Sequence, residues 1–132
     1  MANAIDAQGV VFKNGSVTML ARVVRQDAAN ITQVAISSIV YSVYLLDDDD
    51  PDSREAVTGH DAESVAVADL IYDSLQTDDT WSVDATGYNF AHVLDVSTDQ
   101  AFTVAGKTYL VVFSLTPASG QVILVRFRFQ CV

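Results

Sequence analysis

The sequence predicts an all-β fold, a sandwich of about seven to nine short antiparallel strands, and two features of the chain carry this prediction. Residues 107–132 contain two apolar segments that flank a turn at 116–120, a pattern typical of a β-hairpin. Buried and exposed positions alternate along the second segment: Val125, Phe127, Phe129 and Cys131 against Arg126, Arg128 and Gln130. In addition, 20 of the 132 residues are valine, which favours strands over helices.

The length fits one domain, which can bury about two thirds of its unfolded surface without disulfides or metals. We expect a polar N-terminal arm over residues 1–8 and a single domain over residues 9–132. The other expected strands lie at 9–12, 16–25, 38–46, near Val65, and at 70–73 and 88–94. Residues 63–74 fit neither the strand period nor the helix period, so a short helix remains an alternative there.

The expected core consists of the apolar residues on one face of each predicted strand, together with one tryptophan from a loop. These residues are Val17, Met19, Val23, Tyr41, Val43, Trp81, Phe90, Tyr109, Val111, Phe113, Phe127 and Phe129. Cys131 joins this face as a small buried residue, because nothing in the local sequence would lower its thiol pKa and make it reactive. As the single cysteine of the chain, it forms no internal disulfide.

Negative charge is concentrated in the middle of the chain. Residues 47–84 hold 13 acidic side chains and one basic one, whereas the remaining residues hold 4 acidic and 6 basic ones. Nucleic acid is therefore a poor partner, because binding phosphates requires a basic face. The acidic segment is interpreted either as solvated loops or as the outward side of a molecule whose other side docks on a partner.

The sequence shows neither a membrane-spanning segment nor the basic start and apolar stretch of a signal peptide. We therefore expect no membrane partner and synthesis in a cytoplasm.

The aspartate-rich segment raises the question of calcium. Asp48, Asp50 and Asp52 occupy positions 1, 3 and 5 of an EF-hand loop. Position 6 is Ser53, where the loop requires glycine, and position 12 is Gly59, where it requires glutamate. An EF-hand is thus excluded. The three aspartates remain weak candidates for another type of calcium site, an exposed acidic loop is favoured, and no cofactor is expected.

No residue pattern indicates catalysis. His60 and His92 are the two histidines, and neither belongs to a zinc-ligand spacing or to a Gly-x-Ser-x-Gly motif. We interpret His60 as a surface residue of a loop and His92 as a structural residue of a strand. The expected class is therefore not an enzyme, and no catalytic or cofactor-binding residue is assigned.

Residues 81–132 carry a family resemblance. Gly106 is followed three residues later by Tyr109, which leads into an alternating apolar strand. Together with the segment from Trp81 to Phe90 before it and the hairpin after it, this pattern resembles small immunoglobulin-like structural proteins of tailed bacteriophages and prophages. The resemblance implies an immunoglobulin-like antiparallel sandwich, with the tyrosine at the corner tying the loop to the sheet.

The resemblance also implies a role: a non-enzymatic component of a virion, such as a head decoration, connector or tail protein. Its partners would be other virion proteins and copies of itself, in a homo-oligomer or lattice. We expect these contacts to use the N-terminal arm and the edge of the terminal hairpin. The alternative is an immunoglobulin-like module that recognises a glycan or a protein through its acidic loops, with Tyr72 and His60 as further candidate contacts.

Overall fold

The structure is a computed structural model, and it describes residues 7–24, 29–46, 50 and 53–132. These residues form nine strands and one short helix, α1 (Val67–Leu70). The strands are β1 (Ala7–Val11), β2 (Thr18–Ala21), β3 (Ile36–Leu46), β4 (Arg54–Ala56), β5 (Glu63–Val65), β6 (Ile71–Gln76), β7 (Tyr88–Val93), β8 (Thr108–Pro117) and β9 (Ile123–Cys131). The predicted all-β class is therefore confirmed.

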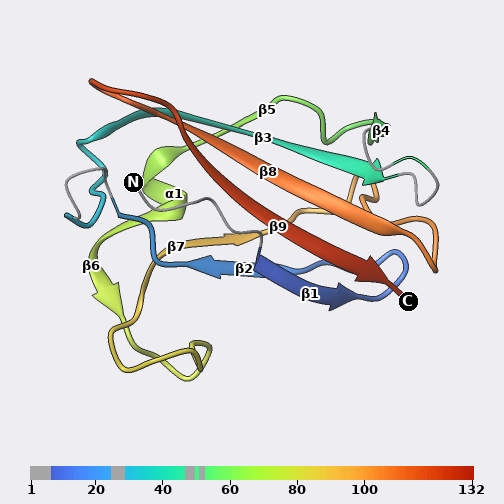
Figure 1. The fold of residues 1–132 in the computed structure, drawn as a ribbon, viewed down its shortest axis with the longest axis horizontal. Helices are drawn as coiled ribbons and strands as arrows, with labels where there is room; N and C mark the ends of the chain where they lie inside the picture. Colours follow the sequence, from blue (N-terminus) through green and yellow to red (C-terminus); the bar gives the residue numbers. More distant parts are fainter. Residues whose placement is uncertain (1–6, 25–28, 47–49, 51–52) are drawn as a thin grey trace.

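The strands form two sheets that pack against each other. The larger sheet has the order β1-β9-β8-β3-β4, with β5 also paired to β3, and the smaller sheet has the order β2-β7-β6. Figure 1 shows β3, β8 and β9 side by side on one side of the molecule and β2 and β7 on the other. The closing hairpin appears as predicted, since β8 and β9 pair antiparallel from Thr108 with Gln130 to Leu115 with Ile123.

The core lies between the two sheets and is built by the alternation that the sequence displays. Tyr109, Val111, Phe113 and Leu115 of β8 are all buried, and Phe127, Phe129 and Cys131 of β9 extend the same face. The smaller sheet contributes Met19 and Phe90, whose side chains are almost fully buried. Val17 is partly buried and packs against this cluster.

Trp81 corrects the predicted core. It is only half-buried, and it lies in the loop between β6 and β7, where its ring contacts Tyr88 at a centroid distance of 5.6 Å. The loop displaces it from the sheets, so the aromatic character of the residue was a poor guide to its burial. The ambiguous segment 63–74 contains both β5 and the short helix α1. A short helix was the alternative that the sequence left open there.

The first strand corrects the predicted antiparallel arrangement. β1 pairs in parallel with β9, from Ala7 beside Phe127 to Val11 beside Cys131. The two strands come from opposite ends of the described chain, so no hairpin connection forces them to be antiparallel. β1 begins at Ala7, so residues 7 and 8 of the predicted arm belong to the sheet, whereas residues 1–6 lie outside the described residues.

This pairing also corrects the expectation that the edge of the terminal hairpin is open to a partner strand. β9 has β8 on one side and β1 on the other from Phe127 to Cys131. That stretch of backbone is therefore already paired within the chain.

Candidate functional site

Of the three calcium candidates, the structure describes only Asp50. Asp48 and Asp52 lie outside the described residues, and Asp50 accepts a backbone hydrogen bond from Ser53 through its carbonyl oxygen at 3.0 Å. Within the described ranges, no group of three or more histidine, cysteine, aspartate or glutamate side chains could hold a metal ion.

His60 is a buried residue and not the surface residue that its loop sequence indicated. Only 2 % of it is exposed, since the turn after β4 folds back onto β3, where Val43 donates a backbone hydrogen bond to the carbonyl of His60. Its Nε2 lies 2.7 Å from the carbonyl oxygen of Asp99, so this nitrogen carries a proton and donates it. Its Nδ1 then accepts a hydrogen bond from the hydroxyl of Tyr41 at 2.8 Å.

The phenol of Tyr41 stays protonated in this arrangement. Burial raises its pKa, and the negative charges of Glu63 and Asp95 raise that pKa further. A protonated Tyr41 is the donor that the acceptor nitrogen of His60 requires. The group is thus a buried hydrogen-bond network that joins β3 to two loops.

His92 lies beside this network, on the core-facing side of β7. Its ring contacts those of Tyr41 at 5.6 Å and Phe113 at 5.4 Å. Burial lowers its pKa below the ordinary value of 6.5, because the charged imidazolium is poorly solvated between these rings. This environment agrees with the structural role that the sequence predicted for His92.

We therefore expect acid to destabilise the protein through His92. The pKa of His92 is lower in the folded protein than in the unfolded chain, so the unfolded chain binds a proton first as the pH falls. The contribution of neutral His92 to the free energy of unfolding is therefore fully present above about pH 6.5 and is lost as the pH falls through the folded pKa. Urea unfolding between about pH 7 and pH 5 measures this loss. His92→Gln should show a flatter pH dependence than the unmutated protein, and two parallel curves would contradict the assignment.

Asn89 is a second buried polar residue, and the sequence analysis did not single it out. The residue is 1 % exposed, and its side chain forms hydrogen bonds with both backbone groups of Val23. Oδ1 accepts from the Val23 amide at 2.7 Å, and Nδ2 donates to the Val23 carbonyl at 2.9 Å. The amide therefore replaces a strand partner where β2 has ended, and its role is structural.

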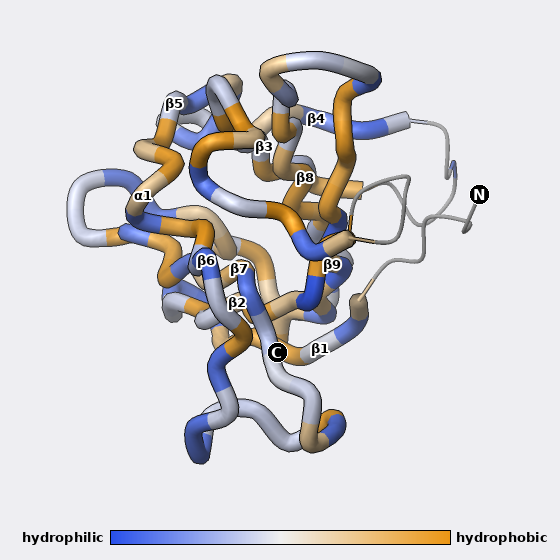
Figure 2. Tube along the Cα trace, turned by 90° about the vertical axis from the view of Figure 1, so that its left-hand side faces the viewer, coloured by the Kyte–Doolittle hydropathy of each residue, from blue (hydrophilic) through white to orange (hydrophobic). Residues whose placement is uncertain are grey.

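The loop between β6 and β7 projects from the sandwich (Figure 1, Figure 2) and is organised around one carboxylate. Asp84 forms an ion pair with Arg22 at 2.8 Å and accepts hydrogen bonds from the Trp81 indole and the Gly87 amide. The bond from Trp81 and then that from Arg22 are the main reasons why the pKa of Asp84 lies well below its usual range. The loop thus has a defined conformation.

Three aromatic rings lie together at the base of this loop. Tyr88 contacts Tyr72 at 5.9 Å and Trp81 at 5.6 Å, and its hydroxyl donates to Asp78 at 2.7 Å. Tyr72 remains 38 % exposed. Tyr72 therefore lies in an aromatic and acidic cluster, while His60, named with it as a candidate contact, lies buried elsewhere.

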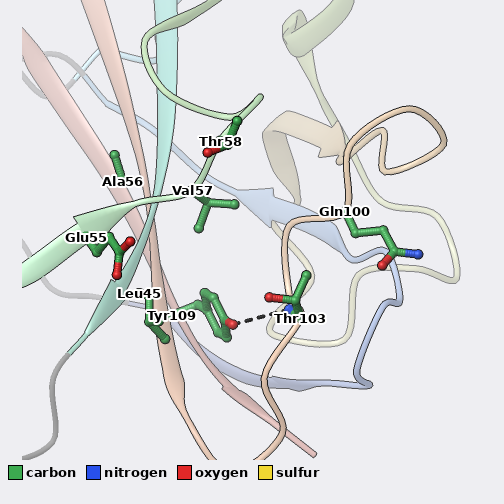
Figure 3. A pocket seen from close by; sticks show the side chains of 8 residues that line it. All are labelled: Leu45, Glu55, Ala56, Val57, Thr58, Gln100, Thr103 and Tyr109. Atoms are coloured by element: carbon green, nitrogen blue, oxygen red, sulfur yellow. Dashed lines mark hydrogen bonds between the residues drawn. The ribbon is translucent and has the colours of Figure 1, made fainter.

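A pocket of about 260 Å³ lies at the end of the sandwich, beside the acidic segment. Figure 3 shows Glu55 at one side and Thr103 and Gln100 at the other, with Val57 between them. The remaining lining residues are Leu45, Ala56, Thr58 and Tyr109. The sequence analysis missed this pocket, because it joins residues from three separate parts of the chain.

Tyr109 fixes one wall of the pocket. Its buried hydroxyl accepts hydrogen bonds from the amides of Thr103 at 3.2 Å and Val104 at 3.0 Å. The loop before β8 is therefore tied to the strand by its tyrosine, as the family resemblance around Gly106 and Tyr109 implied. Cys131 is buried, as predicted, and burial raises the pKa of its thiol, which opposes formation of the reactive thiolate.

The described residues contain no helix with the length and apolar character needed to cross a membrane. No protein family, no curated protein and no solved structure matches the chain.

Proposed function

We propose that the chain is an immunoglobulin-like domain that serves as a non-enzymatic structural component of a phage virion. In this role it docks repeatedly on copies of itself and on other virion proteins. The observation that carries the proposal is the tyrosine at the corner before β8, combined with the order of the strands.

The strand order supports the immunoglobulin-like assignment. Immunoglobulin domains place strands B, E and D in one sheet and G, F and C in the other, and C′ follows C in variable-type domains. Here the smaller sheet has the order β2-β7-β6, and the larger sheet contains β9-β8-β3-β4. With β2 taken as strand B and β9 as strand G, the strands β7, β6, β8, β3 and β4 correspond to E, D, F, C and C′, and only β1 and β5 of the described strands lie outside this correspondence.

The tyrosine corner supports it further. In immunoglobulin-like domains, the hydroxyl of a tyrosine near the start of strand F forms a hydrogen bond with the backbone a few residues upstream. Tyr109 lies at the start of β8, the strand in the F position, and its hydroxyl contacts the amides of Thr103 and Val104.

A docking role agrees with how the side chains are used. The two histidines and Asn89 serve the architecture, and the acidic residues are concentrated in 47–84. A net charge of −10 limits non-specific association, because like-charged copies repel each other unless specific contacts form.

The proposal is tested by looking for the protein in particles. Virions purified from the source of the sequence should contain the protein in many copies, measured by quantitative mass spectrometry and electron microscopy. Purified protein should also form oligomers in analytical ultracentrifugation, and deleting residues 1–6, which leaves β1 in place, should weaken them. Particles that lack the protein, or a protein that remains monomeric at high concentration, would contradict the proposal.

The second candidate is a binding module, and the cluster of Tyr72, Trp81 and Tyr88 favours it. Tyr72 is exposed and Trp81 is half-buried, and such aromatic rings beside carboxylates suit the recognition of a glycan or a protein surface. Glycan-array binding that disappears in Tyr72→Ala, or on replacing the aspartates of 47–52, would support this candidate over a virion component.

A further inference from the structure

We infer that the pocket beside the acidic segment is a binding site for a lysine side chain of a partner protein. The first reason is a row of residues that crosses the larger sheet. Glu55 of β4 lies opposite Leu45 of β3, and Leu45 lies opposite Tyr109 of β8. Residues directly opposite each other share a face of the sheet, and Tyr109 faces the core. The Glu55 carboxylate therefore stands at the end of an apolar row on the core-facing side.

The second reason is the direction of the neighbouring positive charge. Arg54 is the single base of residues 47–84, and its guanidinium lies 4.2 Å from the centre of the Tyr44 ring. Tyr44 alternates with Leu45, so this ring lies on the opposite face of the sheet. Arg54, the basic residue next to Glu55 in β4, is thus stacked on the face of the sheet that points away from the pocket.

The third reason is the opposite wall, which is rigid and polar. Thr103 is held by the hydrogen bond from its amide to the Tyr109 hydroxyl, and Gln100 lies three residues before it (Figure 3). The carboxyl group of Asp99 lies against Gly59, where an added Cβ would come within 2.5 Å of it. A second acidic side chain therefore borders this end of the sandwich.

These features specify the chemistry of the ligand. Leu45, Val57 and the Tyr109 ring can cover an aliphatic stem, while the carboxylate and the threonine hydroxyls can accept the three protons of an ammonium group. The volume of about 260 Å³ is smaller than a cleft for a drug-sized ligand, so it fits one side chain.

The partner is a protein segment, because the pocket has room for one side chain and positive charge on the segment that presents it would complement Glu55 and Asp99 at this end of the sandwich. That this neighbour belongs to a virion rests on the proposed function, whereas the preference of the pocket for lysine does not. A negative result from the particles and a negative result from the pocket are therefore distinguishable.

The experiment is an NMR titration of the full chain with a capped alanine pentapeptide that carries one central lysine. We expect saturable shifts of the amides of Val57 and Thr103, with norleucine in place of lysine abolishing them. Glu55→Gln should weaken binding about three- to fivefold, the value of one partly exposed ion pair. Glu63→Gln is the matched control, since it removes an acidic residue from another strand paired to β3, and it should change affinity less than about twofold.

Three results would overturn the inference. Equal effects of the two substitutions, or shifts spread over the acidic segment, would show non-specific attraction. A tighter complex with 1,5-diaminopentane than with the peptide would assign the pocket to a small amine and not to a protein.

Discussion

Replacing Phe113 with alanine is expected to lower the free energy of unfolding by about 3–5 kcal/mol. The side chain is fully buried at the centre of β8. Its ring contacts Phe90 of the smaller sheet at 4.9 Å and Phe127 of β9 at 5.9 Å, both edge to face. The substitution removes these contacts and leaves a cavity that two rigid sheets cannot close. Such a loss is a large fraction of the roughly 5–15 kcal/mol that stabilises a domain of this kind.

Urea unfolding followed by circular dichroism measures the loss, and Phe12→Ala is the control. Phe12 follows β1 and is 76 % exposed, so its removal should change stability by less than about 0.5 kcal/mol. If the two substitutions had similar costs, the core would not lie between the sheets as described.

The sequence predicted those parts of the fold that depend on local alternation. β8 and β9 appeared as two apolar arms because each buries one side, and the period of two places Phe113 and Phe127 on that side. The same reasoning placed Met19, Phe90 and Val111 correctly. Alternation does not report direction between distant strands, so the parallel pairing of β1 with β9 was not predicted.

The buried polar residues depend on contacts that no local pattern carries. His60 has its partners in Tyr41, 19 residues away, and Asp99, 39 residues away. A histidine among glycine and aspartate residues therefore resembles a surface loop until the fold supplies those partners. Trp81 shows the converse, since its loop has its own hydrogen bonds through Asp84 and remains outside the core.

The candidate pocket was beyond sequence reasoning for the same reason. Glu55 follows the aspartate-rich segment and was counted there as one of many solvated charges. Only the pairing of β4 with β3 and of β3 with β8 places its carboxylate in a row with Leu45 and Tyr109. The overall charge of the region was evident from the sequence, but the position of one carboxylate on the core-facing side was not.

Replacing Asn89 with alanine is expected to cost about 2–4 kcal/mol, because it leaves two backbone groups without partners at a buried position. The amide and the carbonyl of Val23 both bond to the Asn89 side chain, and Val23 is itself 7 % exposed. Water has little access to replace those bonds, so their loss carries most of the desolvation penalty of each group.

Gln76→Ala provides the matched control for Asn89→Ala. It also removes a side-chain amide, but that amide donates to Ser74 on an exposed part of β6, so the expected change is below about 0.5 kcal/mol. Hydrogen exchange gives a local readout, because the Val23 amide should exchange much faster in Asn89→Ala while the amide of Val111 in β8 keeps its protection. Unchanged exchange at Val23 would show that the Asn89 side chain does not hold the chain beyond β2 to β7.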